Sequence, residues 1–389
     1  MSSIRVCSNP LLAKTSAATR RISFRVAAPL GVLPVSPNSI LPRYKPTSRY
    51  VNLGSSPASI IRWAQRADRI WSFNKGRNSS DRCSGRFWEE WGDPMRDEAL
   101  FEASVKRELV HKRSVSEVFL TDFVQTSSRR FIAGAQWPRW HVFYGSPDGS
   151  PDSALMAETL RQAVIFMSHL CGVPLTHKFL MPYMSISVEA ALLDPLVPAQ
   201  VAVELDVKDM KLSGGQLSAL TVTARFVVDG TPIGEGAAAA RIVNPATYQR
   251  LRGAVPTVLP AAGEDLLACA DVGHATQRNV MLGPSSRPFV WPLRVDPTHP
   301  IFFDHPLDHV PGMLLVEAAR QAARAACSRP DVDFALFEAE FMKLVEFSYP
   351  VDVVVTRLES HAAHGVMRVR LLHEEETLMS LVAQVKTPH

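Results

Sequence analysis

A short helical segment occurs twice in the chain, and this repeat limits the folds that the sequence can adopt. Residues 157–163 read AETLRQA, and residues 316–322 read VEAARQA. The correspondence extends beyond the segment. His141 lies 17 positions before Glu158, and His299 lies 18 positions before Glu317. Internal repetition of this kind is typical of a duplicated structural unit. We therefore predict two copies of one domain.

In each copy, short apolar runs of strand type surround one long helix. The first copy has strand-like runs near residues 118–120, 131–137, 184–192, 201–207, 220–228 and 233–243, and a helix over 153–171. The second copy has such runs near residues 279–282, 289–295, 341–347, 351–358, 366–372 and 378–385, and a helix over 311–327. Two strands, a helix and several further strands indicate an α+β fold in which an antiparallel sheet wraps around the helix.

The repeat also gives the expected domain boundaries. The first copy covers residues 106–243 and the second covers residues 276–388, packed side by side as one pseudo-dimer. Residues 244–275 contain Pro245 and Pro256 and form the expected linker.

Charge is distributed unevenly, and this bears on possible partners. Residues 1–94 hold 15 of the 42 basic and 5 of the 38 acidic residues, which leaves 27 basic and 33 acidic residues, a net charge of −6, for the rest. Because nucleic-acid binding depends on neutralising phosphates, an acidic body argues against it. No apolar run approaches the roughly 18 to 20 residues of a membrane helix, so we expect no membrane span.

The five cysteines are scattered, without the spacing of a zinc site or a disulfide framework. We expect no metal and a cytoplasmic location. Residues 1–94 admit three interpretations: a transit peptide, a disordered basic arm, or an artefact of a start codon placed too far upstream. Met95 begins a segment that resembles an ordinary bacterial N-terminus.

The helix of the second copy carries charged residues although it is apolar on nearly every side. Glu317, Arg320 and Gln321 are three and four positions apart and therefore project from one face. A solvated ion pair is the simplest alternative, but charge on a buried helix is costly unless it is compensated. The same Glu-x-x-Arg-Gln pattern, with Glu158, Arg161 and Gln162 in the first copy, favours a functional role.

A loop that could take part in chemistry precedes this helix. Gly312 would let a ligand carbonyl approach the free N–H groups of the first helical turn, a donor site for a developing oxyanion. His305 and Glu317 could transfer protons on opposite sides of that carbonyl. For His305 and for His309, a hydrogen-bonded loop histidine is the alternative. The segment resembles the active-site segment of hot-dog hydroxyacyl-ACP dehydratases, with the histidine nearer to the Pro-Gly.

Taken together, the motifs resemble the A-factor synthase family of γ-butyrolactone autoregulator biosynthesis. They are FIAGAQWPR (131–139), AETLRQA (157–163), VPLTH (173–177), FDHPLDHVPG (303–312) and LVEAARQ (315–321). The resemblance covers roughly residues 106–388 and implies two tandem hot-dog domains. Residues 1–94 have no counterpart in the family pattern.

The resemblance implies an acyltransferase without a cofactor. Such an enzyme joins a β-ketoacyl group, carried as a thioester on acyl carrier protein, to the hydroxyl of dihydroxyacetone phosphate, and the ester is a precursor of a γ-butyrolactone signal that controls antibiotic production. The catalytic residues of the family map onto Glu158, Glu317 and Arg320, and Arg161 occupies the matching place in the first copy.

We expect Glu317 to have a raised pKa and to act as the base. Arg320 would either keep Glu317 ionised or bind the substrate phosphate. The first copy lacks the Pro-Gly, so we expect the main site in the second copy. The expected substrate-binding residues are Gly312, Gln321 and His309 in the second copy and Arg161 and Gln162 in the first. A dehydratase, a thioesterase or a non-catalytic acyl-binding regulator are alternatives, and the oligomeric state stays open.

Overall fold

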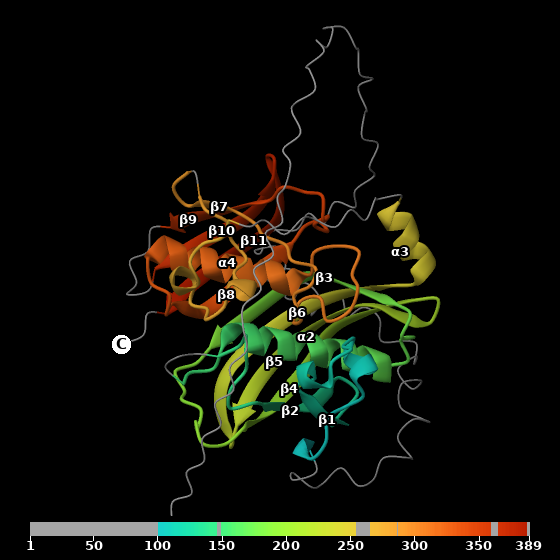
Figure 1. Cartoon of the computed structure of the whole chain (residues 1–389). Coiled ribbons are helices and arrows are strands. Elements are labelled where there is room, and N and C mark those ends of the chain that lie inside the picture. The colour runs from blue at the N-terminus through green and yellow to red at the C-terminus, as the bar shows by residue number, and fades with distance from the viewer. Residues whose placement is uncertain (1–99, 146–148, 254–264, 286, 359–364, 387–389) are drawn as a thin grey trace, which may run out of the picture. The chain divides into compact units, whose positions relative to one another are not determined.

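The computed structural model of the chain describes residues 100–145, 149–253, 265–285, 287–358 and 365–386 (Figure 1). All of them belong to one compact unit, residues 50–389. The predicted N-terminal extension, residues 1–94, lies outside the described residues, and so do residues 254–264 of the predicted linker.

The described strands form one sheet in which every neighbouring pair is antiparallel, in the order β1-β2-β4-β5-β6-β3-β8-β11-β10-β9-β7. The strands of the first copy are β1 (Leu120–Gln125), β2 (Arg130–Trp137), β3 (Lys178–Val188), β4 (Ala199–Ser213), β5 (Gln216–Val228) and β6 (Thr231–Val243). Those of the second copy are β7 (Val290–Pro292), β8 (Asp333–Phe341), β9 (Asp352–Leu358), β10 (Val366–His373) and β11 (Glu376–Lys386).

Each half of the sheet packs on one long helix, α2 (Ser153–Leu170) or α4 (Gly312–Cys327) (Figure 1). Asp152 caps the start of α2, since its carboxylate accepts hydrogen bonds from two N–H groups of the first turn. Both helices are buried on nearly all sides, as their apolar composition predicts. A shorter helix, α3 (Pro245–Arg252), follows β6. Short 3-10 turns cover Arg107–Val110, Val115–Glu117, Cys269–Val272 and Gln277–Asn279.

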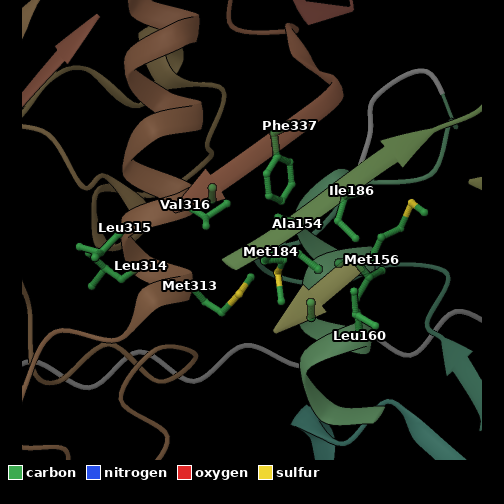
Figure 2. Close-up of a cluster of buried hydrophobic side chains, with 14 of the residues drawn as sticks. Ala154, Met156, Leu160, Met184, Ile186, Met313, Leu314, Leu315, Val316 and Phe337 are labelled. Carbon is green, nitrogen blue, oxygen red and sulfur yellow. The ribbon is translucent and has the colours of Figure 1, made fainter. Parts of the chain in front are cut away.

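The two halves join where β3 pairs with β8. Ile186 lies opposite Phe337 and Met184 lies opposite Ala339 in this register. Figure 2 shows Phe337 among Met184, Ile186 and side chains of α2 and α4, so the apolar core is continuous across the join. This arrangement confirms the prediction of two tandem copies, each with antiparallel strands wrapped around a long helix, and joins their strands into one continuous sheet.

Identical hydrogen bonds in the two halves show how closely the copies correspond. The side-chain oxygen of Gln162 accepts from the Phe119 N–H at 3.0 Å, and that of Gln321 accepts from the Met281 N–H at 2.8 Å. In addition, Nδ1 of His141 and of His299 accepts from the backbone N–H groups two and three residues later. These shared bonds fix which residues are equivalent.

Two predicted strands of the second copy differ from the structure. The run 341–347 was expected to be a strand, but the strand is β8, residues 333–341. Phe337 and Ala339 face the core while Glu338 and Glu340 face outward, so acidic residues interrupt the apolar run that a sequence search detects. The run 279–282 forms a 3-10 turn and one isolated bridge from Leu282, because residues 277–279 turn instead of extending.

Replacement of Phe337 by alanine tests the importance of the join. The side chain is fully buried, so we expect a loss of about 3 to 5 kcal/mol in the free energy of unfolding, measured by denaturant titration. Leu192→Ala, at a residue that is 78% exposed, is the control and should change stability by about 0.5 kcal/mol or less. Equal effects of the two substitutions would contradict a core that is continuous across β3 and β8.

Candidate active site

A cavity of about 640 Å³ lies between the two copies. Part of its wall is the middle of α2, with Glu158 and Arg161, and part is the start of α4, with Gly312 and Met313. Apolar side chains line much of the remainder, among them Val164, Phe179, Met184, Leu315 and Phe341. The cavity therefore offers one polar region next to space for an apolar group, which is typical of a small-molecule site.

Glu158 is the centre of the polar wall. Its carboxylate accepts two hydrogen bonds from Arg161, both of 2.8 Å, and one from Gln162 at 2.9 Å. Lys112 completes the shell, with Nζ 3.0 Å from Oε1. Burial raises the pKa of Glu158, but the charges of Arg161 and Lys112 outweigh this effect and lower the pKa well below its ordinary value. Glu158 is therefore a carboxylate at neutral pH and a weak base.

Arg161 differs from its partners because 22% of its side chain is exposed. It uses Nε and Nη2 for Glu158, while a guanidinium has five N–H donors in all. Within the described part of the chain, its Nη1 group has no hydrogen-bond partner, and the side chain lines the cavity. Arg161 can therefore bind an anionic group of a substrate.

The start of α4 opens onto the same cavity. Its N-cap residue is Pro311, and no side chain of the described residues caps the first turn. A Cβ at Gly312 would lie 3.1 Å from a ring carbon of Phe341, so glycine lets the backbone sit close to its surroundings. The N–H groups at a helix start carry partial positive charge. This turn can hydrogen-bond an oxygen that becomes negative during a reaction.

His305 lines the cavity just before this helix, with 35% of its side chain exposed. Its Nδ1 lies 3.7 Å from Asp304, and Asp304 accepts hydrogen bonds from the backbone N–H groups of Arg113 and Ser114. Burial lowers the pKa of His305, and the charge of Asp304 offsets this only in part. The imidazole is thus neutral at pH 7 and able to accept a proton.

His309 also lines the cavity, but its Nδ1 bonds to Asp308 at 2.7 Å. The Tyr248 hydroxyl donates to the same carboxylate at 2.9 Å, and Arg252 binds both Asp308 and Glu346. His309 is therefore part of a network that joins α3 to the loop before α4.

Glu317, the counterpart of Glu158, does not line this cavity. It is fully buried, and its carboxylate is bonded by Arg320, by Gln321 at 2.8 Å and by His274 at 2.7 Å. Burial alone would raise the pKa of Glu317. The charge of Arg320 and the hydrogen bond with His274 lower the pKa by more than burial raises it, so it lies well below its ordinary value. The expectation of a raised pKa was wrong, because the charge of Arg320 and the hydrogen bonds to the buried carboxylate outweigh desolvation.

Arg320 is enclosed by carboxylates. Its side chain is 2% exposed, and besides Glu317 it contacts Asp152 at 3.1 Å and Asp333 at 3.6 Å. Its donors are thus directed at groups of the protein, on both copies. This geometry does not suit Arg320 for binding a substrate phosphate, the second role considered from the sequence.

The start of α2 is closed, in contrast to that of α4. Asp152 accepts from the N–H groups of Ala154 and Leu155, and Ser153 donates to Asp333 from both its backbone and its hydroxyl. Pro311, which has no acceptor side chain, stands at the equivalent of Asp152. The N–H groups that are open at α4 are therefore occupied at α2.

An aromatic ring packs on His274, the histidine that binds Glu317. Phe143 stacks on His274 with ring centroids 5.1 Å apart and also contacts the rings of His299 and Phe302. The shared histidine bonds make Ile301 the equivalent of Phe143, and Ile301 lines the open cavity. The smaller side chain stands on the open side and the larger ring on the closed one.

The structure therefore groups the predicted site residues differently from the sequence. It brings Glu158 and Arg161 of the first copy together with His305 and Gly312 of the second. Glu317, five residues after Gly312 in the same helix, lies on the closed side. Gln162 and Gln321 were expected to bind substrate, but both side chains are fully buried. Each donates hydrogen bonds to the buried glutamate of its copy and to a backbone carbonyl in the segment before the first strand.

Sequence reasoning missed Lys112 and His274, the side chains that bind the two glutamates in addition to the arginines. Lys112 lies seven residues before Phe119, whose N–H donates to Gln162. His274 lies seven residues before Met281, whose N–H donates to Gln321. Their positions are equivalent, but their side chains differ, so the repeat pattern did not reveal them. Alignment of the segments before the first strands would have found the pair.

No helix among the described residues is long and apolar enough to cross a membrane. The same residues contain no cluster of three or more histidine, cysteine or acidic side chains arranged to hold a metal ion.

Comparison with known proteins gives matches over both copies. A family model described as the A-factor biosynthesis hotdog domain matches residues 95–244 and 268–377. A 2-oxo-3-(phosphooxy)propyl 3-oxoalkanoate synthase of Streptomyces virginiae is 38% identical over 283 residues, 71% of this chain and 95% of that protein. Proteins of the same name from Streptomyces coelicolor and Streptomyces griseus are 34% and 33% identical over 70% and 72% of this chain, and over 88% and 95% of their own lengths.

Solved structures give weaker matches. A 12:0-ACP thioesterase from Umbellularia californica is similar over 66% of this chain and 94% of its own, with a TM-score of 0.43 and 12% identity. A protein with a hot dog fold from Alicyclobacillus acidocaldarius matches over 71% of this chain and 100% of its own, with a TM-score of 0.37 and 12% identity.

The different surroundings of the two arginines lead to a stability prediction. Arg320→Met leaves buried carboxylates without their cation, so we expect it to lower the free energy of unfolding by about 3 to 5 kcal/mol. The matched change Arg161→Met should cost clearly less, because Lys112 still compensates Glu158 and Arg161 is partly exposed. Denaturant titration of both variants measures the difference, and equal losses would contradict the distinction between a closed and an open side.

Proposed function

The chain belongs to the A-factor biosynthesis hotdog family, and we propose how its cavity makes the ester for which its Streptomyces relatives are named. That name, 2-oxo-3-(phosphooxy)propyl 3-oxoalkanoate synthase, describes an acyltransferase. Its product is a 3-oxoalkanoyl group joined to the hydroxyl of dihydroxyacetone phosphate. We propose the same activity here, as a step towards a γ-butyrolactone of the A-factor type.

The proposed substrates are a β-ketoacyl thioester on acyl carrier protein and dihydroxyacetone phosphate. The apolar part of the cavity, with residues such as Val164 and Leu315 in its wall, suits the acyl chain. The polar wall around Glu158 suits the phosphorylated acceptor. The observation that carries the proposal is that an uncapped helix start and a cation with free donors face one cavity from two different copies.

The start of α4 stabilises the charge that develops in the reaction. When the acceptor oxygen attacks the thioester carbon, the carbonyl oxygen gains negative charge. Gly312 and Met313 line the cavity, and their N–H groups, which the first turn leaves without an intrahelical partner, can donate to that oxygen, while the dipole of α4 adds to the effect. An occupied helix start could not do this, which is why the side next to α2 is unsuited to the same step.

His305 accepts the proton of the acceptor hydroxyl. Its Nδ1 makes no hydrogen bond within the described part of the chain and lies 3.7 Å from Asp304; this nearby carboxylate favours a proton on Nδ1, and in that tautomer Nε2 holds the lone pair that accepts the proton. The new C–O bond then forms while the C–S bond breaks, and the thiolate takes the proton from His305. Glu158 is a positioning residue in this scheme, because an ionised carboxylate held by four donor groups is a poor base.

Arg161 binds the phosphate of the acceptor. Its planar guanidinium matches two phosphate oxygens, and Glu158 holds the group in one orientation from behind. The phosphate would thereby fix the acceptor hydroxyl relative to the thioester, and such orientation is a major source of rate enhancement.

Product analysis tests the proposed function directly. Purified protein is incubated with a β-ketoacyl thioester of acyl carrier protein and dihydroxyacetone phosphate, and the products are identified by mass spectrometry. We expect an ester that contains both the acyl group and the phosphate, and its formation should require both substrates. Free acid or an enoyl product without incorporation of the acceptor would contradict the proposal and favour a thioesterase or a dehydratase.

The role of His305 predicts a specific pH dependence. The neutral imidazole is the active form, so kcat/KM should fall as the pH drops through its pKa, which lies below the ordinary 6.5. His305→Gln should lose roughly 10² to 10⁴ in rate and lose this acid limb as well. His373→Gln, at a half-buried histidine that stacks on Tyr349 and does not line the cavity, is the control. An unchanged acid limb in the His305 variant would assign the proton transfer to another group.

A further inference from the structure

Two basic side chains stand at the mouth of the cavity, and the mechanism above does not use them. Lys178 begins β3, and Arg241 lies near the end of β6. The strand register pairs Leu180 with Arg241, and Lys178 lies two residues before Leu180. The two cations are therefore diagonal neighbours on one face of the sheet. Both are exposed and both line the cavity.

The two cations have no carboxylate partner among the residues that the structure describes. The Nζ group of Lys178 lies 6.0 Å from the centre of the Tyr248 ring. Like charges side by side on a sheet repel each other, and everything after Pro94 carries an excess of acidic residues. Adjacent cations without a counterion at a cavity mouth therefore point to an anionic ligand.

We propose that Lys178 and Arg241 bind the 4′-phosphate of the pantetheine arm that carries the acyl thioester. This inference rests on the proposed function, because it assigns the pair to the donor of that reaction. A guanidinium binds two phosphate oxygens at once, and an ammonium adds a point charge. The site would hold the outer end of the arm while the thioester lies at the start of α4.

The spacing along β3 favours the donor over the acceptor. The Met181 side chain lies beside Gly312, where the thioester carbonyl is expected. Lys178 lies three residues before Met181, and a strand rises by about 3.3 Å per residue, so the two backbones are about 10 Å apart. Dihydroxyacetone phosphate has only a three-carbon chain between its hydroxyl and its phosphate, whereas the pantetheine arm is several times longer. A phosphate site that lies this far along β3 from the start of α4 therefore suits the arm better.

Three donors with the same acyl group test the proposal in the full chain: the carrier-protein thioester, the coenzyme A thioester and the pantetheine thioester without phosphate. The Lys178→Ala/Arg241→Ala variant should lower kcat/KM about tenfold or more for both phosphorylated donors, mainly through KM. Its kcat/KM for the pantetheine thioester and its KM for dihydroxyacetone phosphate should stay unchanged.

The control variant is Lys208→Ala/Arg225→Ala. It removes the same charge from exposed positions of the sheet that do not line the cavity, and we expect no change with any donor. Arg161→Lys is a second reference, because it should raise the KM for dihydroxyacetone phosphate. Thermal unfolding of each variant verifies its folding.

Each contrary outcome has a definite meaning. A loss limited to the carrier-protein donor would show that the pair contacts the carrier protein itself, and this would overturn the phosphate assignment. A raised KM for dihydroxyacetone phosphate would place the acceptor phosphate there, and equal losses with all three donors would remove any role for a phosphate.

A binding measurement separates this proposal from the proposed function. Calorimetry should show that the wild-type chain binds pantetheine 4′-phosphate about tenfold more tightly than pantetheine and that the Lys178→Ala/Arg241→Ala variant loses this difference. Equal binding of the two compounds by the wild type would overturn the site. A wild type that makes no ester but shows the binding difference would refute only the proposed function.

Discussion

A carboxylate in the interior of each half is the constraint on which the rest of the site depends. Glu158 on α2 and Glu317 on α4 are both buried, and a buried charge is tolerated only when cations and donors replace its water. In each copy an arginine three residues later in the helix, Arg161 or Arg320, binds the glutamate, and a second partner, Lys112 or His274, comes from the segment before the first strand. The buried glutamate thus ties the helix to the start of its own copy.

The two copies differ in what else their arginine contacts. Arg320 reaches Asp152 and Asp333, and so it holds the start of α2 against the second copy. At the equivalent place Pro311 offers no acceptor, which leaves the start of α4 open and Arg161 with donors to spare. One carboxylate cluster thus serves as a structural junction while the other forms the wall of a cavity.

The repeat, the long helices and most strands could be predicted from sequence because they depend on local periodicity and capping. The pairing of site residues could not. Gly312 and Glu317 are close in sequence, so they were assigned to one site, but in the fold Gly312 lines the same cavity as Glu158, and Glu317 does not line it. The strand β8 was misplaced because Glu338 and Glu340 interrupt its apolar run, although they alternate with Phe337 and Ala339 as in a strand with one buried face. His274 was missed because no residue of its type stands at the equivalent position.

The central claim is that catalysis uses one composite site, with Glu158 from the first copy and the start of α4 from the second. A crystal structure with a non-reactive thioether analogue of the β-ketoacyl donor tests it most directly. The account predicts the analogue in the cavity beside Glu158, with its acyl carbonyl oxygen within hydrogen-bond distance of the N–H groups of Gly312 or Met313. An analogue bound beside Glu317, with the ring of Phe143 displaced, would contradict the account.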